Sequence, residues 1–348
     1  QIYSGFAFRS QDLGEHGIPV VKIANIQNKR VNPECSDHFP EKLCTEKLNR
    51  YFLQASDFLI SMTGAGSVGK VGKMPRMGER FLVNQRVAIV RPDDSRCDPA
   101  FVYFALSQDF YETKLYGLGL GAGQPNVSAK QIGELEIPFP PLLVQRRIAG
   151  ILSAYDELIE NNQRRLRILE DMARSLYREW FVHFRYPGHE SVPLVDSPLG
   201  QIPQGWDAKK LGDIAEDMRR NIPKGKLDEP QPYVGLENIP RRSLALDSWE
   251  TVSELGSNKL AFKKGEVLFG KIRPYFHKVS IAPFDGLCSA DTIVIRARQP
   301  EHYAIVASCV SSDEFGAHAT ATSNGSKMPR ANWRAPNEQP LPLPNSAV

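Results

Sequence analysis

The stretch YFLQASDFLISMTGAGSVGKVGKMP (residues 51–75) decides the fold, because the chain repeats its plan as KLAFKKGEVLFGKIRPYFHKVSIAP at residues 259–283. Few side chains are identical, but the order of features is kept. Asp57 corresponds to Glu266, 209 residues further along the chain.

Two further stretches of the first copy recur in the same order. LVNQRVAIVRPD (82–93) is matched by LCSADTIVIRARQ (287–299), and GAGQPNVSAKQIGELEIPFPPL (121–142) by SNGSKMPRANWRAPNEQPLPLP (323–344). Gln85 then corresponds to Asp291 at an offset of 206 residues. Pro125 corresponds to Pro329 at an offset of 204. A repeat this long indicates two similar domains and not a solenoid of short units.

Length and composition agree with two soluble domains. The chain has 348 residues, of which 41% are hydrophobic and 24% are charged, and it can bury two ordinary cores. We find no apolar run that approaches a membrane span and no secretory signal. The five cysteines are scattered and never in CxxC spacing, which indicates neither disulfides nor zinc and favours the reducing cytoplasm.

Basic residues gather at corresponding places in the repeat, although the net charge is only +3. Each copy has six basic residues against one acid: Lys70, Lys73, Arg76, Arg80, Arg86 and Arg91 against Glu79, and Lys259, Lys263, Lys264, Lys271, Arg273 and Lys278 against Glu266. One such cluster could be a solvated face. Its recurrence predicts a surface that faces phosphates.

A long helix is expected between the copies, starting at Pro141 and ending before Pro187. Its seam residues recur at steps of three and four: Ile148, Ile151, Tyr155, Leu158, Asn162, Leu166, Leu169, Ala173, Leu176 and Trp180. This spacing is typical of a coiled coil. About 40 helical residues would span about 60 Å. Such a seam needs a partner helix, and we find no other helical pattern of comparable length in the chain.

The fold class predicted is α+β, with two similar domains joined by this long coiled-coil-type helix. Short β-rich runs broken by turn signals recur in both copies, and a helix follows at residues 99–116 and again at 302–319. The expected parts are a first domain (1–140), the helix (141–186), a linker rich in Pro and Gly (187–200), and a second domain (201–348).

No catalytic set emerges. Residues 64–70, GAGSVGK, fit the P-loop pattern, but Val71 stands where Ser or Thr is needed, and Gly72 and Pro75 prevent the required helix. We expect a glycine-rich hairpin there. The second copy, FGKIRPYFHK, lacks the glycine-rich run, which is typical of a loop whose contents vary. The seven histidines have no metal-ligand spacing.

The chain resembles the specificity subunits of type I restriction–modification systems. The resemblance covers essentially the whole chain and rests on residues 4–26 (SGFAFRSQDLGEHGIPVVKIANI), 138–184 (PFPPLLVQRRIAGILSAYDELIENNQRRLRILEDMARSLYREWFVHF), 198–216 (PLGQIPQGWDAKKLGDIAE) and 324–333 (NGSKMPRANW).

The resemblance implies a non-enzymatic, cytoplasmic subunit with two target-recognition domains. Each would read one half of a split sequence in double-stranded DNA, and the helix would set the spacing. The implied partners are two methyltransferase subunits that use S-adenosylmethionine, and restriction subunits that use ATP and magnesium. No cofactor is expected on this chain, and no membrane.

The residues expected to contact DNA are polar or basic loop residues. In the first domain they are Lys70, Lys73, Asn84, Gln85, Arg86, Gln124 and Asn126. In the second they are Lys271, Arg273, Tyr275, His277, Lys278, Asn324, Lys327 and Arg330. On the helix, Arg164, Arg165, Arg167 and Glu170 are expected to face the methyltransferase subunits. The competing interpretation for each is a solvated surface residue, and for Tyr275 or Phe276 packing on a sheet.

The chain departs from the family at both ends. The first copy lacks a counterpart of GQIPQGWDAKKLGDIAE (200–216), and the second copy lacks a trailing long helix. Two hypotheses therefore stay open. The chain is a DNA-reading subunit whose missing helix is supplied elsewhere, for example by another specificity polypeptide. Alternatively, it is a truncated interaction module that dimerises through its exposed helix seam.

Overall fold

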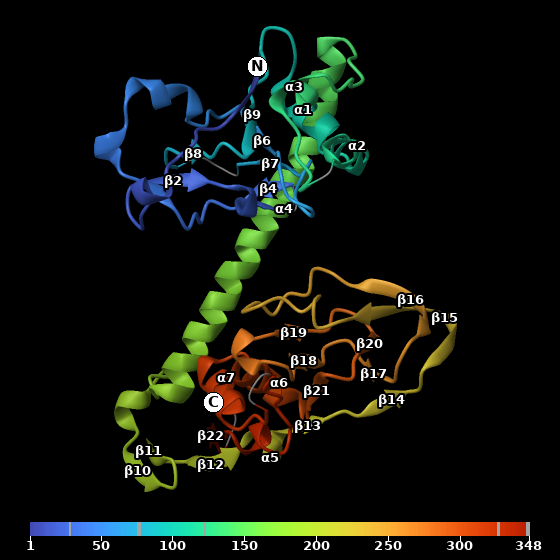
Figure 1. Ribbon diagram of the computed structural model, residues 1–348. Helices are drawn as coiled ribbons and strands as arrows, with labels where there is room; N and C mark the ends of the chain where they lie inside the picture. Colours follow the sequence, from blue (N-terminus) through green and yellow to red (C-terminus); the bar gives the residue numbers. More distant parts are fainter. Residues whose placement is uncertain (28, 75–77, 122, 326–327, 346–348) are drawn as a thin grey trace. The chain divides into compact units, whose positions relative to one another are not determined.

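The computed structural model describes residues 1–348 except 28, 75–77, 122, 326–327 and 346–348. The chain groups into two compact units, Gln1–Glu160 (unit 1) and Asn161–Val348 (unit 2). The division falls inside one long helix, α4 (Leu142–Tyr177), so each unit includes part of that helix (Figure 1). Both units combine sheets with helices, which confirms the α+β class.

The part of unit 1 that the structure describes forms two sheets. The larger has the order β1-β9-β6-β7-β4-β3, with β1 (Ile2–Ser4), β9 (Val87–Val90), β6 (Phe58–Ser61), β7 (Val71–Lys73), β4 (Arg30–Val31) and β3 (Ile26–Gln27). The smaller has the order β5-β2-β8, with β5 (His38–Phe39), β2 (Ile18–Val21) and β8 (Leu82–Val83). The α-helices beside α4 are α1 (Pro99–Leu106), α2 (Asp109–Gly119) and α3 (Ala129–Gly133), and short 3-10 turns cover Ser10–Asp12, Ile23–Asn25, Glu41–Leu43 and Glu46–Tyr51.

Strand β6 is buried on both faces and lies at the centre of the unit 1 core. Phe58 and Ile60 pack in one cluster with Leu115 of α2, whereas Leu59 packs in a second cluster with Val21 of β2. Successive side chains of a strand point to opposite faces. The continuous apolar run of β6 therefore joins two cores, one beneath the helices and one beneath the smaller sheet.

The described residues of unit 2 form four sheets. Its central sheet has the order β13-β21-β18-β19, with β13 (Ala215–Asp217), β21 (Thr292–Ala297), β18 (Val267–Gly270) and β19 (Val279–Ile281). A five-stranded sheet has the order β14-β17-β20-β15-β16, with β14 (Arg220–Ile222), β17 (Lys259–Phe262), β20 (Gly286–Ser289), β15 (Gly225–Val234) and β16 (Glu250–Leu255). Two antiparallel pairs complete it: β10 (Leu194–Ser197) with β11 (Gly200–Pro203), and β12 (Trp206–Lys210) with β22 (Pro340–Pro344).

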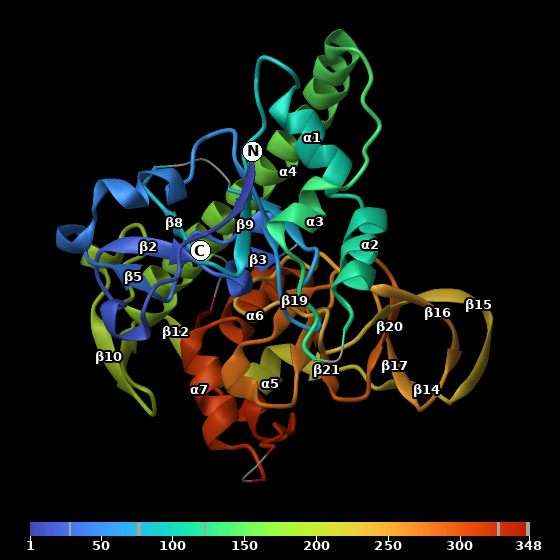
Figure 2. The same ribbon diagram turned by 45° about the horizontal axis from the view of Figure 1, so that its top comes forward.

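The helices of unit 2 are short apart from the end of α4. They are α5 (Leu211–Ile214), α6 (Tyr303–Val310) and α7 (Asp313–Ala321), with 3-10 turns at His189–Ser191, Pro274–Phe276 (η7), Pro300–His302 and Pro336–Glu338. The ribbon of β15 and β16 lies on the side of unit 2 opposite α7 (Figures 1 and 2).

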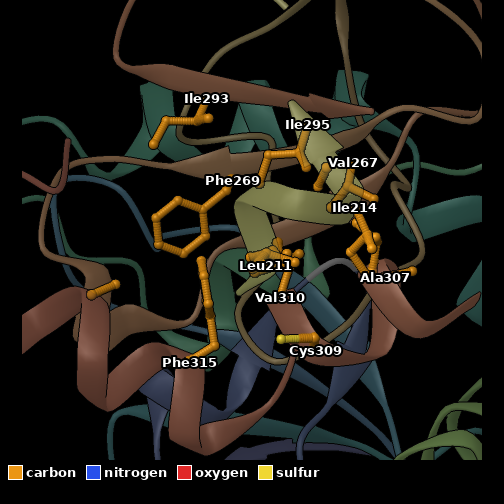
Figure 3. Close-up of a cluster of buried hydrophobic side chains, with 14 of the residues drawn as sticks. Leu211, Ile214, Val267, Phe269, Ile293, Ile295, Ala307, Cys309, Val310 and Phe315 are labelled. Atoms are coloured by element: carbon orange, nitrogen blue, oxygen red, sulfur yellow. The ribbon is translucent and has the colours of Figure 1, made fainter. Parts of the chain in front are cut away.

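The central sheet of unit 2 repeats part of the larger sheet of unit 1. Strands β13-β21-β18-β19 take the places of β1-β9-β6-β7, and α6 and α7 take the places of α1 and α2. As in β6, alternate residues of β18 face different clusters. Val267 and Phe269 pack with Phe315 of α7 (Figure 3), and Leu268 packs in the other cluster with Phe262.

The strand registers fix the correspondence between the copies. Leu59 lies opposite Ile89, and Leu268 lies opposite Val294, which gives offsets of 209 and 205 residues for the two strands. The offset of 209 agrees with the prediction for Asp57 and Glu266. The predicted offset of 206 for Asp291 is wrong by one, since Asp291 occupies the place of Arg86 and not of Gln85.

The single helices expected at residues 99–116 and 302–319 are each two helices. The chain becomes extended at Gln108 before α2 and at Ser312 before α7. The Ser312 hydroxyl accepts a hydrogen bond from the Phe315 amide at 3.1 Å, so it caps a new helix. The sequence pattern missed the break because the apolar residues of the two helices face the same sheet. Their spacing therefore continues across the break as it would in a single helix.

A buried carboxylate stands before the central strand of each unit. In unit 1, Asp57 accepts from the Gln54 amide at 2.9 Å and from two nitrogens of Arg91, at 2.8 and 2.6 Å. In unit 2, Glu266 accepts from the Lys263 amide at 2.8 Å. It also accepts two bonds from Arg220, at 2.8 and 2.7 Å. The two carboxylates therefore fill the same structural role, and Arg91 of the first basic cluster is an internal residue.

The expected long helix between the copies is present. Helix α4 covers 36 residues and continues into a turn of π-helix, Arg178–Val182. In unit 1 the buried side chain of Gln145 fixes the first turns of α4. Its Oε1 accepts a hydrogen bond from the Asp98 backbone amide at 3.0 Å, and its Nε2 donates to the Pro140 carbonyl at 2.7 Å. The seam residues Leu158 and Leu169 are 54% and 59% exposed.

We expect the buried carboxylates to stabilise their own units. Glu266→Gln leaves Arg220 without its counter-charge and should lower the free energy of unfolding of unit 2 by about 3 kcal/mol. The four tryptophans, Trp180, Trp206, Trp249 and Trp333, all belong to unit 2, so their fluorescence during urea unfolding reports this change.

The matched control is Asp285→Asn, which breaks the exposed Lys263–Asp285 ion pair at 2.8 Å and should cost less than about 1 kcal/mol. Asp57→Asn should shift the unfolding seen by circular dichroism without shifting the tryptophan transition. An unchanged urea midpoint for Glu266→Gln would contradict the structural role of the pair.

Candidate nucleic-acid interface

Loops that carry most of the predicted DNA-binding residues of unit 1 meet at Met62, the residue after β6. Its amide donates to the Arg86 carbonyl at 2.9 Å, and its carbonyl accepts from the Val127 amide at 2.8 Å. The Gly64 amide donates to the Pro125 carbonyl at 3.1 Å. The β6–β7 loop, the β8–β9 turn and the segment before α3 therefore share one edge of the unit.

In unit 2 the corresponding loops meet at Lys271, and we call each of these two meeting points a junction. The Lys271 amide donates to the Asp291 carbonyl at 2.8 Å, and the Lys271 carbonyl accepts from the Ala331 amide at 3.0 Å. The Arg273 amide donates to the Pro329 carbonyl at 2.8 Å, as the Gly64 amide does to Pro125. The predicted correspondence of Pro125 and Pro329 is confirmed by this shared hydrogen bond.

The β6–β7 and β18–β19 loops keep a left-handed residue at each end. In unit 1 these residues are Gly64 (φ +108°) and Gly69 (φ +85°). In unit 2 they are Arg273 (φ +52°) and His277 (φ +49°). The residues of this loop differ between the copies, as the loss of the glycine-rich run indicated, while the backbone turns at both ends of the loop in each unit. A left-handed non-glycine residue costs about 1–2 kcal/mol, and such strain gathers at functional sites.

In unit 1 the junction presents polar side chains to solvent. Gln85, Arg86, Gln124 and Asn126 are exposed, and Lys70 and Asn84 are half-buried. The Asn84 carboxamide oxygen accepts from the Arg86 amide at 3.2 Å and stiffens the β8–β9 turn. Lys73 lies apart from the others, at the far end of β7, with its ammonium 5.8 Å from the centre of the Tyr103 ring.

In unit 2 two of the predicted cations are used internally. The Lys271 ammonium donates to the Ala290 carbonyl at 2.6 Å, and the Lys278 ammonium donates to the Leu236 carbonyl. Burial lowers the pKa of both ammonium groups, and for Lys278 the charge of Arg241 lowers it further. These lysines contribute charge to the junction while their donors are partly occupied.

Among the other predicted residues of unit 2, Tyr275, Asn324 and Arg330 are more open, whereas Arg273 is half-buried and the His277 side chain is only 11% exposed. Tyr275 is 47% exposed and its ring meets Phe276 edge-on, with 4.8 Å between the ring centres. Asn324 and Arg330 are exposed and exchange two backbone hydrogen bonds, at 3.1 and 2.9 Å. Lys327 lies outside the described residues.

The structure also reveals a residue that the sequence pattern missed. The guanidinium carbon of Arg241 lies 4.0 Å from the centre of the Phe276 ring. Arg241 is 35 residues away from Phe276 along the chain, so no local spacing pointed to it. The available signal was the pair Arg241-Arg242, which follows the apolar stretch YVGLENIP (233–240).

On α4 the predicted partner-binding residues fall into two groups. Arg164, Arg165 and Arg167 are exposed and stay candidates for a partner surface. Glu170 differs from the expectation, since its side chain is only 10% exposed.

The Glu170 carboxylate binds a loop of unit 2. It accepts from the Ser243 hydroxyl at 2.9 Å and from the amides of Leu244 and Ala245 at 2.8 and 3.1 Å. This carboxylate therefore holds the helix against its own unit.

In the described residues, neither the glycine-rich loop nor the acidic, histidine and cysteine side chains form the sites that their residue types could suggest. Residues 64–70 form the loop between two strands, and no helix follows them, which confirms that this segment is not a P-loop. Among the described residues no group of three or more His, Cys, Asp or Glu is placed to hold a metal ion. Within the same residues, none of the helices has the length and apolar character needed to span a membrane.

Comparison with known families gives a consistent result. Residues 2–171 match the family described as the type I restriction modification DNA specificity domain. The chain is 26% identical over 253 residues to the specificity subunit of the type I restriction enzyme MjaIX of Methanocaldococcus jannaschii, which covers 70% of this chain and 57% of the relative. It is 24% identical over 363 residues to the EcoDI specificity subunit of Escherichia coli, covering 97% and 78% of the two chains.

Among solved structures, the chain is similar to the S subunit of the type I restriction–modification system from M. genitalium. The TM-score is 0.56 at 18% sequence identity, over 99% of this chain and 82% of the other. This likeness shows the fold. The chain spans little more than half of the M. jannaschii relative, 57% by aligned length.

We expect the left-handed residue at the start of the β6–β7 loop to be essential to the junction. Gly64→Ala should lower the free energy of unfolding by about 1–2 kcal/mol, because alanine resists a positive φ. Gly66 in the same loop has no positive φ and open space where a Cβ would lie, so Gly66→Ala should be neutral. Thermal unfolding followed by circular dichroism compares the two variants, and equal stabilities would contradict the assignment.

Proposed function

Because the chain belongs to the family of type I restriction–modification specificity subunits, we propose that it reads a two-part DNA target for such a complex. The observation that carries this proposal is the repeated loop junction at Met62 and Lys271. Each junction gathers exposed amide and guanidinium side chains on a rigid backbone frame. Such side chains read base edges in the major groove, while Lys and Arg on phosphates fix the register.

The two junctions share a backbone but carry different side chains, which supports a target with two unlike halves. In unit 1 the exposed side chains include Gln85 and Asn126, and in unit 2 Tyr275 and Arg330. We assign one half-site to each unit, and to α4 the role of spacer.

The chemistry would belong to other subunits. The relatives are named specificity subunits, and this chain would recruit methyltransferase subunits that use S-adenosylmethionine and restriction subunits that use ATP and magnesium. Exposed cations of α4, Arg164, Arg165 and Arg167, are the proposed contacts with the methyltransferase subunits. This work would take place in the cytoplasm, where the DNA is.

We expect variants in the two junctions to change different halves of one target. The chain is produced with its methyltransferase subunits, and methylation-sensitive sequencing of the host DNA gives the motif. Arg86→Ala should relax the base preference in one half of a split motif, because it removes about 1–3 kcal/mol of discrimination against the wrong base at the affected base pair. Arg330→Ala should relax the base preference in the other half. The proposal would be contradicted if both variants altered the same half of the motif. It would also be contradicted if the soluble wild-type complex gave no motif.

The exposed seam of α4 favours a second candidate, an interaction module that dimerises through this helix. Ile151, Leu158 and Leu169 are each more than half exposed. In this case the wild-type chain should sediment as a dimer, and Leu158→Glu should shift it to a monomer by placing a charge in the apolar interface. The matched control is Arg165→Glu on the polar face. A monomeric wild-type chain at micromolar concentration rules this candidate out.

A further inference from the structure

Unit 2 carries beside its β18–β19 loop a guanidinium stack whose ring has a buried valine in its place in unit 1. Arg241 lies over Phe276, with 4.0 Å from the guanidinium carbon to the ring centre, and Arg273 lies 5.9 Å from the same ring. The β6–β7 loop ends at the left-handed Gly69 and the β18–β19 loop at the left-handed His277. The residues directly before them, Val68 and Phe276, therefore correspond. Val68 is 2% exposed and belongs to the core.

The backbone holds both members of the stack in place. Phe276 lies in the turn η7, between the left-handed residues Arg273 and His277. Arg241 faces Lys278 in an antiparallel bridge, and the neighbouring Arg242 amide donates to the His277 carbonyl at 2.9 Å. The guanidinium is therefore presented by two tied segments and not by a free loop.

Among the residues that the structure describes, no carboxylate pairs with Arg241. No carboxylate oxygen of the described residues lies within 4.0 Å of it, whereas the adjacent Arg242 pairs with Asp313 at 2.9 Å. Arg241 is also exposed. A guanidinium stacked by its face on a ring keeps its edge donors free to bind a ligand.

We propose that Arg241, stacked on Phe276, is a specificity-determining residue that reads a guanine in the half-site of unit 2. This inference rests on the proposed DNA-reading function and deepens it. The O6 and N7 acceptors of guanine match the planar fork of arginine, and this pairing is the commonest specific contact in the major groove. Arginine can also bind a phosphate through its planar fork, but a phosphate contact carries no base preference, and the experiment below separates the two.

The test determines the DNA motif of the complex with its methyltransferase subunits for the wild type and for variants. Arg241→Gln should lose the preference for one guanine in one half of the motif and leave the other half intact. Affinity for the wild-type site should fall by roughly 5- to 150-fold. Arg241→Lys should behave in the same way, because an ammonium cannot form the bidentate contact.

Two further variants make the result specific to the stack. Phe276→Leu keeps Arg241 but removes the aromatic ring on which Arg241 stacks. This variant should lose the guanine preference in the same way as Arg241→Gln. Arg242→Gln makes the same charge change one residue away and should leave the motif unchanged. Tryptophan fluorescence of unit 2 verifies that each variant is folded.

The inference is overturned if Arg241→Lys keeps the wild-type motif, or if Arg241→Gln only weakens binding to all sequences and reduces its salt dependence. Both results would assign Arg241 to a phosphate. If the wild type yields a split motif that none of these variants alters, this inference fails and the proposed function stands. If the soluble wild-type complex yields no motif, both fail.

Discussion

The candidate interface of each unit depends on the backbone hydrogen bonds of a single residue. Met62 and Lys271 each follow a central strand buried on both faces, and each ties two distant loops to that strand through its own amide and carbonyl. Side chains take no part in these bonds. The frame can therefore stay fixed while every exposed side chain on it changes, which suits a surface whose task is to distinguish one base sequence from another.

Much of the fold could be predicted from the sequence because it rests on the repeat and on apolar periodicity. The offsets for Glu266 and Pro329, the long helix and the α+β class are all reproduced in the structure. The offset for Asp291 was wrong because the turn before β21 carries no glycine or proline to mark its position. The retained loop turn was hidden for a related reason, since Arg273 and His277 adopt a conformation that their residue types rarely adopt.

The candidate site could be predicted only in outline. Most of its loops were recognised, but the roles of Glu170, Lys278 and Arg241 depend on contacts between segments that lie 35 to 75 residues apart in the chain. Residue type alone suggested that Glu170 was a surface charge. Its three donors from residues 243–245 make it an internal anchor, and no local pattern could have distinguished the two.

The two buried carboxylates obtain their arginines from different strands. Arg91 follows β9 in unit 1, whereas Arg220 begins β14 in unit 2. By strand register, Gly5 occupies the place of Arg220 in unit 1. Arg296 occupies the place of Arg91 in unit 2, where it pairs with Glu216 at 2.7 Å. A hybrid gene that joined the first strands of unit 1 to the rest of unit 2 would bury Glu266 without Arg220, whereas the reverse hybrid would keep Asp57 with Arg91. The ion pairs therefore make an exchange of first strands asymmetric between the two units.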